Sequence, residues 1–555
     1  MEKYICIHGH FYQPPRENAW LEVIELQDSA HPYHDWNERI SAECYATNAA
    51  SRILNSQGAI KNIINNYSRI SFNFGPTLLS WMAENDKETY DAIIEADRES
   101  AKRFSGHGSA MAQVYNHIIM PLANRRDKET QIIWGIHDFA SRFNRYPEGM
   151  WLAETAVDTE SLELLAKHNI KFTVLAPRQA KAIRKIGTEK WESVNDSTID
   201  TRRPYRVSLP SGNSISVFFY DGGVSQAVAF NGLLFDGKKF GDALLSAFGK
   251  PTSGPQLVHI ATDGETYGHH HKHGEMALAY CLDYIQNVAQ ARLTNYGEYL
   301  EKVPVEYEAT IHENSSWSCV HGVERWKSNC GCNTGGNPGW TQQWRAPLRE
   351  SLDWLRDQFE KIFAFEGSLI LKDPWVARNE YIHVILNRNE ETIDRFLKDH
   401  AIVGVQPNQV FRMLEMQRHA LLMYTSCGWF FDEISGIETT QILQYACRAI
   451  QLVVQISDQD LEEEFLRLLE RAPSNIPSLA NGAEVYRKYV LPTKINLTRV
   501  GMHYAVSCLF EEDLESIPVF NFRTENELFI KKEAGEQKLV LGITKVRSEV
   551  TRTEK

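Results

Sequence analysis

Short apolar stretches rich in β-branched and aromatic residues recur through the first half of the chain. They span residues 4–8, 70–74, 111–115, 149–153, 172–176, 214–220 and 257–262. Several are nearly continuous rather than alternating, which is typical of parallel strands buried on both faces. The segments between them are mostly long enough for helices, as at 160–170 and 276–293. The pattern predicts right-handed βαβ units and seven parallel strands, which either close as a barrel or stay open.

The second half of the chain has a helical periodicity of apolar positions without intervening strands. The helical stretches are 344–363, 380–400, 408–424 and 439–456. Residues 526–546 then alternate around Ala-Gly-Glu at 534–536, which predicts a terminal β-hairpin. We therefore expect a strand-rich domain at 1–305, a Trp/Cys-rich loop with a helical domain at 306–425, and a helical region with a hairpin at 426–555.

Polar side chains follow five of the predicted strands at the same end. In barrels and open α/β sheets, active sites form beyond the carboxyl ends of parallel strands, so these residues are expected to meet. The five polar segments are His8–Gln13, Tyr115–His117, Trp151–Glu154, Tyr220–Asp221 and Asp263–His270.

Two chemistries could use this set. Glycoside hydrolysis needs two carboxyl groups, and Glu154 and Asp263 lie on separate strands, where they could face each other across a cleft. Nearby aromatic rings could stack on sugars: Trp151, Tyr115 and Tyr267. Metal-assisted hydrolysis would instead use zinc ligands drawn from His8, His10, His117, Asp263 and His269. Any single one of these side chains could also be an ordinary helix cap or loop residue.

Five short motifs at these positions resemble those of glycoside hydrolase family 57, over the first 300 residues or so and at a segment near 317. The matching segments are His8-Gly9-His10 with Gln13-Pro14, His117, Glu154 in WLAE, Asp263 in DGETYGH, and Trp317 in ENSSWS. The resemblance implies a (β/α)7 barrel followed by a helical region, and action on α-glucans with retention of configuration. Phe11-Tyr12 and His270 depart from the family's common pattern, and both departures concern sugar subsites.

The resemblance also implies roles for these residues. Glu154 would be the nucleophile and Asp263 the acid/base, with their carboxyl groups facing each other at the mouth of the barrel. Glu265 would orient Asp263 or His269, and Trp317 would close one side of the cleft from the second domain. The substrate-binding set is then His8, His10, Gln13, His117, Trp151, Asp221, Glu265, His269 and Trp317. No cofactor and no catalytic metal are expected.

The loop at 313–345 has neither helical nor strand periodicity and is rich in Trp, Cys, Gly and Asn. Cys319, His321, Cys330 and Cys332 are four potential zinc ligands, although the usual paired C-x₂-C spacing is absent. The other reading is a glycine-rich loop that packs over the barrel mouth and lines the substrate. Its tryptophans suit sugar platforms and domain-interface cores equally: Trp317, Trp326, Trp340 and Trp344.

The charge balance narrows the set of partners. Lys and Arg number 59 against 72 Asp and Glu, which gives a net charge of −13. Nucleic acids and anionic membranes are bound by basic surfaces, so neither is expected, whereas a neutral α-glucan or oligosaccharide is compatible. The absence of a long apolar run and of an N-terminal signal pattern favours a cytoplasmic location. Six of the nine cysteines are dispersed, which fits reduced buried thiols.

Two other function classes remain open at this point. A metal-dependent carbohydrate hydrolase, of the polysaccharide deacetylase or zinc α-mannosidase type, would give Glu154 no evident role. A non-enzymatic glycan-binding protein would have no need of both carboxylates. Hydrolysis and transfer to an acceptor sugar, as in amylases, glucanotransferases or branching enzymes, are equally compatible with the retaining reading.

Overall fold

The computed structural model describes residues 2–250, 254–287, 291–511, 517 and 519–555. They form two compact units. The first comprises Met1–Pro15 and Leu26–Glu324, and the second comprises Arg16–Glu25 and Arg325–Lys555. The first unit thus continues past residue 305, and the division into three domains stays a prediction. No helix among the described residues is long and apolar enough to cross a bilayer.

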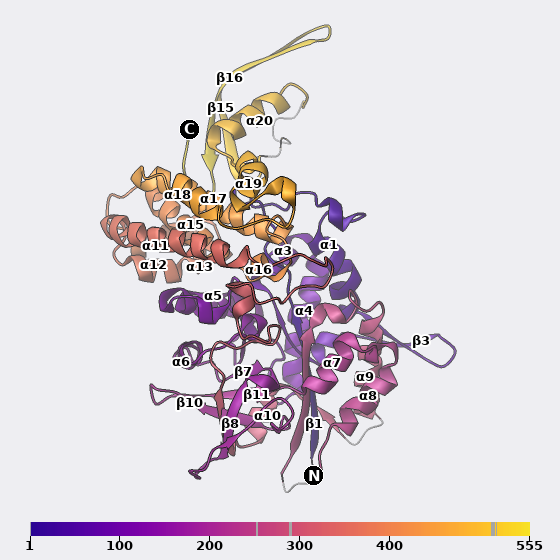
Figure 1. The fold of residues 1–555 in the computed structure, drawn as a ribbon. Coiled ribbons are helices and arrows are strands. Elements are labelled where there is room, and N and C mark those ends of the chain that lie inside the picture. The colour runs from indigo at the N-terminus through magenta and orange to yellow at the C-terminus, as the bar shows by residue number, and fades with distance from the viewer. Residues whose placement is uncertain (1, 251–253, 288–290, 512–516, 518) are drawn as a thin grey trace. The chain divides into compact units, whose positions relative to one another are not determined.

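The first unit is a (β/α)7 barrel, and all seven predicted strands are present in it (Figure 1). Parallel ladders and single bridges join neighbouring strands in the order β12, β1, β4, β5, β6, β7, β11. Between β11 and β12, the Asp221 N–H donates to the His259 carbonyl oxygen at 2.8 Å. The strands are β1 (Lys3–Phe11), β4 (Ser71–Phe74), β5 (Ala112–Gln113), β6 (Met150–Trp151), β7 (Phe172–Leu175), β11 (Ser214–Phe219) and β12 (Gln256–Asp263).

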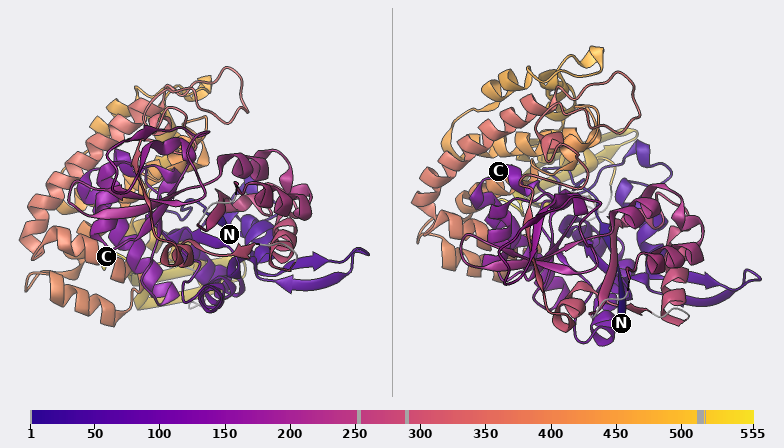
Figure 2. Two further views of the ribbon diagram at one scale, coloured as in Figure 1. Left: turned by 90° about the horizontal axis from the view of Figure 1, so that it is seen from below. Right: turned by 60° about the horizontal axis from the view of Figure 1, so that its bottom comes forward.

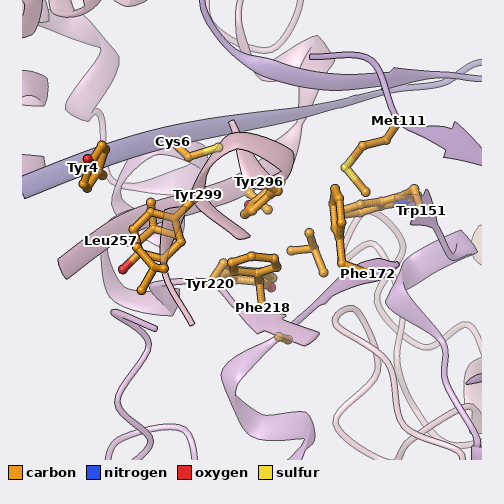
Figure 3. Close-up of a cluster of buried hydrophobic side chains, with 14 residues drawn as sticks. Tyr4, Cys6, Met111, Trp151, Phe172, Phe218, Tyr220, Leu257, Tyr296 and Tyr299 are labelled. Carbon is orange, nitrogen blue, oxygen red and sulfur yellow. The ribbon is translucent and has the colours of Figure 1, made fainter. Parts of the chain in front are cut away.

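Inward-facing side chains of these strands fill the barrel. Tyr4 and Cys6 of β1 meet a buried cluster that includes Phe218 and Trp151, and Figure 3 shows this cluster. Phe218 packs on Tyr296 of α10 (Tyr296–Lys302), with ring centroids 4.7 Å apart. The interior is therefore a packed core, and chemistry is left to the strand ends.

Helices lie between the strands, as the long intervening segments predicted. In α6 (Thr159–Lys167), the Asp158 side chain caps the first turn by accepting from the Ser161 N–H, and the leucines face inward. The predicted helix at 276–293 is wrong at its end. It appears as α9 (Gly274–Asn287); residues 288–290 lie outside the described residues, and Arg292–Leu293 form β13 beside β1. The others are α3 (Pro76–Asn85), α4 (Lys87–Arg103), α5 (Arg125–Phe143), α7 (Gly222–Phe230) and α8 (Gly237–Ser246).

Some strands of the first unit were not predicted. A sheet in the order β7, β11, β10, β14, β8, β9 extends from the barrel, and the hairpin β2–β3 projects from this unit (Figure 2). Strands such as β3 and β8 are mostly exposed or half-buried and carry charged residues, so they lack the apolar runs of buried strands. Their bounds are β2 (Ser51–Leu54), β3 (Ile60–Ile64), β8 (Ala180–Lys185), β9 (Glu192–Ser193), β10 (Pro204–Ser208) and β14 (Tyr307–Ile311).

The second unit is helical and carries a hairpin, as predicted. Its long helices are α11 (Arg345–Ile370), α14 (Glu390–His400), α15 (Pro407–Leu422) and α17 (Ile437–Ser457), and the hairpin joins β15 (Phe522–Ala534) to β16 (Gln537–Ser548). The short segment Arg16–Glu25 belongs to this unit. In it, the Trp20 indole N–H donates to Gln451 at 2.7 Å, and Glu22 pairs with Arg388 and Arg418.

Candidate active site

Glu154 stands on a strained turn just beyond β6. Glu154 and the next residue, Thr155, have φ values of 57° and 51°, the left-handed region that residues other than glycine rarely adopt. Gln179 holds this turn: its Nε2 donates to the Thr155 carbonyl oxygen at 2.9 Å, and its Oε1 accepts from the Thr155 hydroxyl at 2.8 Å. Such conformations persist only where neighbours enforce them, and they are common at active sites.

Two donors fix the Glu154 carboxylate. Its Oε2 accepts from the Trp317 Nε1 at 2.9 Å and from the Ser318 Oγ at 2.5 Å. The Trp317 N–H also donates to the Glu154 carbonyl oxygen at 3.0 Å. Hydrogen bonds to an ionised oxygen are among the stronger ones, so the pair of donors suits a negatively charged Glu154. All three residues belong to the first unit.

Asp263 ends β12, where it is the one exposed residue of the strand and pairs in register with His10. Its side chain reaches solvent, but surrounding protein atoms exclude much of the water around the carboxyl group. This desolvation, with the charges of Glu154 and Glu265, raises the pKa of Asp263 well above its ordinary value. The two carboxyl groups thus interact, and the raised pKa favours the protonated form of Asp263. The separation of the Glu154 and Asp263 carboxyl groups remains a prediction.

His8, His10 and His117 form one buried network with Ser71 and Asn73. Burial lowers the pKa of His8 and His10 to about 3 and that of His117 well below its ordinary value, so all three rings are neutral. One proton assignment then satisfies the contacts. Ser71 donates to His8, which donates to the Asn73 side-chain oxygen at 3.1 Å. The Asn73 amide donates to His10 at 2.9 Å, and His10 donates to His117 at 3.1 Å.

This network bears on two of the predicted roles. Both ring nitrogens of His8 and of His10 are engaged by protein side chains, which leaves a zinc ion no ligand from either ring without rearrangement. Trp151 is fully buried and stacks on His8 and His10, with centroids 4.8 and 5.0 Å apart. These residues are buried, and their direct contact with a sugar remains a prediction.

Two aromatic rings suggested as sugar platforms lie in the core instead. Tyr115 is buried and packs edge-on against Trp134, with ring centroids 5.4 Å apart. Tyr267 is fully buried, and its hydroxyl accepts from the Thr262 hydroxyl. In the structure, neither ring is open to a sugar. Each stands beside a polar strand end in sequence but packs inward.

The structure gives Glu265 different contacts from those expected. Its Oε1 accepts from the Tyr45 hydroxyl at 2.5 Å and from the Tyr12 N–H at 2.9 Å, so its carboxylate orients neither Asp263 nor the His269 ring by a hydrogen bond. Burial raises the pKa of Glu265 to about 7. Tyr12 in turn stacks on His117, with centroids 3.7 Å apart.

The other predicted binding residues lie around this centre. Gln13 is half-buried and hydrogen-bonds to Tyr45. The Asp221 side chain caps α7 by accepting from the Val224 N–H at 2.9 Å. His269 is partly exposed and pairs with Glu43 at 2.5 Å. Asp221 and His269 therefore have structural partners, and their contact with substrate stays a prediction.

Three residues that hold the site were not predicted. Asn73 is a lone polar residue within the apolar run 70–74, and that interruption was a usable signal. Ser318 adjoins Trp317, but a serine in a polar loop carries no signal of its own. The sequence around Gln179 gave no signal either, because only the fold brings Gln179 to Thr155.

Two family models match this chain. The family model described as glycosyl hydrolase family 57 matches residues 4–312, and a domain of unknown function, DUF3536, matches residues 340–555. The chain is similar in structure to an exo-type maltose-forming amylase from Pyrococcus sp. ST04, with a TM-score of 0.66 and 16% identity over 94% of this chain and 96% of that one.

A second similar structure is a branching enzyme of the same family from Pyrococcus horikoshii, with a TM-score of 0.51 and 14% identity over 94% of this chain and 99% of that one. No curated protein matches the chain in sequence. The family model covers more than half of the chain and spans both candidate acids, Glu154 and Asp263. The chain therefore belongs to glycosyl hydrolase family 57.

Proposed function

We propose that this protein cleaves α-linked glucans by retaining double displacement, with Glu154 as nucleophile and Asp263 as acid/base. The observation that carries the proposal is the contrast between the two carboxyl groups. Asp263 is exposed and has a raised pKa, which favours its protonated form, while Glu154 receives two hydrogen bonds suited to a negative charge. Two carboxyl groups in different protonation states are what acid-assisted displacement at an anomeric carbon requires.

In the first step, the Glu154 carboxylate attacks C1 of the sugar while Asp263 gives its proton to the departing glycosidic oxygen. A covalent glycosyl-enzyme forms, and the carboxylate of Asp263 remains. In the second step, Asp263 takes a proton from water or from an acceptor sugar hydroxyl, which attacks C1 and releases Glu154. Water gives hydrolysis, and a sugar hydroxyl gives transfer.

Family membership and the two similar structures support an α-glucan substrate. Those proteins are described as a maltose-forming amylase and a branching enzyme. A neutral polysaccharide also suits a chain with a net charge of −13. Trp317 is half-buried beside Glu154 and is the aromatic ring best placed to contact a sugar there.

Azide rescue of alanine variants tests the two roles, with an activated aryl α-maltooligoside as substrate. Glu154→Ala should lose turnover by about 10³-fold or more, and azide should restore it with the inverted glycosyl azide as product. Asp263→Ala should be restored by azide with the retained product, because the nucleophile is still present. Glu192→Ala, which removes an exposed carboxylate on β9, is the control.

Rescue with the opposite stereochemistry in either variant would reverse the assignment. Full turnover of both variants would exclude this pair of acids. Wild-type protein should then be incubated with maltooligosaccharides, and reducing ends and chain lengths should be measured together. New reducing ends indicate hydrolysis, whereas longer or branched products without them indicate transfer.

A further inference from the structure

The loop between β14 and α11 brings together four side chains that the proposed reaction does not use. One ligand atom from each of Cys319, His321, Cys330 and Cys332 lies within 4.8 Å of the other three. Among the described residues, these four form the group of His, Cys, Asp and Glu side chains whose ligand atoms lie close enough together to hold a metal ion. None of the three cysteines forms a disulfide. All four residues lie in the loop at 313–345, within 13 positions of one another in the sequence.

We propose that these four residues bind one zinc ion in a structural site. Three thiolates and one imidazole form a common ligand set of structural zinc. With Zn–S near 2.3 Å and Zn–N near 2.0–2.1 Å, tetrahedral ligand atoms lie about 3.5–3.8 Å apart. The ligand atoms here lie at most 4.8 Å apart. Movements of about 1 Å, which side-chain rotation can supply, would therefore bring them to the distances of a tetrahedral zinc site. Four protein ligands leave no open position for catalysis.

The backbone arranges the ligands in two short pairs. Gly322 follows His321 with a φ of 89°, and its N–H donates to the Cys319 carbonyl oxygen at 3.1 Å, which turns the chain back on itself. Gly331 stands between Cys330 and Cys332 with a φ of 83°. Glycine reaches this region without the steric penalty that other residues meet. The segment Cys319–Gly322 is thus a tight turn that bears two ligands, and Gly331, in the left-handed region, separates the other two.

The chemistry of the donors favours zinc over a disulfide. A disulfide would consume two of the three thiols and leave the third thiol and His321 without a function in the cluster. Soft thiolates with an imidazole in a tetrahedral arrangement suit zinc, and all four donors are then used. Zinc binding needs no oxidant, since each cysteine only releases its proton.

The proposed site adjoins the donors to Glu154. Ser318 directly precedes Cys319, and the side chains of Trp317 and Ser318 both donate to the Glu154 carboxylate. A metal bound at Cys319 would hold this end of the loop in place and so keep both donors in register. This positioning role rests on the proposed function, whereas the zinc site itself does not.

Metal analysis of the full chain, purified without a histidine tag, tests the site. We expect about one zinc per chain by elemental mass spectrometry. The cobalt-substituted protein should show thiolate-to-cobalt charge-transfer bands and the intense d–d bands of tetrahedral Co²⁺. The double variant Cys330→Ser/Cys332→Ser should lose at least about tenfold in zinc content. Cys427→Ser, at a half-buried cysteine outside the loop, should keep it.

Wild-type zinc content in the double variant would overturn the proposal. Finding seven titratable thiols in the denatured protein would also overturn it, because a disulfide would use two of the nine cysteines. Tryptic cleavage after Lys327, an exposed residue between the two ligand pairs, tests the loop. Chelation should speed this cleavage by about tenfold or more and reduce glucan turnover. Bound zinc whose removal changes neither would refute the positioning role, and zinc in an enzyme inactive on glucans would refute only the proposed function.

Discussion

At the scale of single residues, the buried Glu265 influences the pKa of Asp263, the proposed acid/base. Its negative charge helps to raise the pKa of Asp263, so replacing it with neutral glutamine should let Asp263 lose its proton at lower pH. We expect the alkaline limb of kcat/KM to move to lower pH in Glu265→Gln. A pH–rate profile against Glu192→Gln measures this. An unmoved limb would mean that Glu265 does not act on Asp263 electrostatically.

The same variant should change stability with pH. The pKa of Glu265 is raised from 4.5 to about 7, so the folded state retains a proton that the unfolded chain has released between these values. Wild-type stability therefore falls as pH rises through this window, and Glu265→Gln escapes the loss. By urea unfolding, the variant should gain up to about 3 kcal/mol over wild type at pH 8, and much less at pH 4.5. Equal differences at both pH values would contradict this.

Trp317 combines a ring and a donor, and substitutions can separate them. Trp317→Phe keeps an aromatic face but loses the hydrogen bond to Glu154, so kcat should fall about tenfold with little change in KM. Trp317→Ala loses the sugar contact as well, and KM should rise by about 3- to 10-fold. Steady-state kinetics on a maltooligosaccharide measure both. If Trp317→Phe behaves as wild type, the indole N–H has no role in catalysis.

At the scale of elements, the turn after β6 depends on a residue from the next strand–helix connection. Gln179 donates to the Thr155 carbonyl oxygen and accepts from the Thr155 hydroxyl and from the Ala176 N–H, and it is fully buried. Gln179→Ala should therefore cost about 2–4 kcal/mol of unfolding free energy and lower kcat as the left-handed turn relaxes. Gln57→Ala, at an exposed position, is the control. Unchanged kcat in a destabilised variant would limit Gln179 to a structural role.

The sequence predicted the elements that bury most apolar surface. All seven barrel strands and the long helices α11, α14, α15 and α17 were predicted, because continuous apolar runs and helical periodicity report burial directly. Strands such as β8 and β9 were missed because most of their residues are exposed or half-buried and are of mixed polarity. The two candidate acids, Glu154 and Asp263, were predicted from their place at strand ends. Their partners Asn73, Gln179 and Ser318 were not, because each acts across a long sequence separation that only the fold closes.

At the scale of the whole molecule, the second unit is completed by a segment from near the N-terminus. Burial alone would raise the pKa of Glu22, but the charges of Arg388 and Arg418 outweigh it and hold the pKa well below its ordinary value. A carboxylate with a lowered pKa stabilises the fold above its unfolded pKa and loses this contribution as pH falls.

Glu22→Ala should therefore destabilise the protein by about 1–3 kcal/mol at pH 7, with the difference from wild type shrinking below about pH 4. Urea unfolding at both pH values measures it, and Glu25→Ala, at an exposed carboxylate of the same segment, is the control. A loss that persists unchanged at low pH would show that packing rather than charge makes Glu22 important.

The segment Arg16–Glu25 is also synthesised long before the rest of the second unit to which it belongs. Trp20 and Glu22 leave the ribosome early, but Gln451, Arg388 and Arg418 follow 431, 366 and 396 positions later. At roughly 5–20 residues per second, the early segment waits on the order of 20–80 s for its partners. For that time an indole and a carboxylate destined for the second unit extend from the half-made chain. Slow translation or premature termination before the last of these partners would leave that segment exposed to chaperones and proteases.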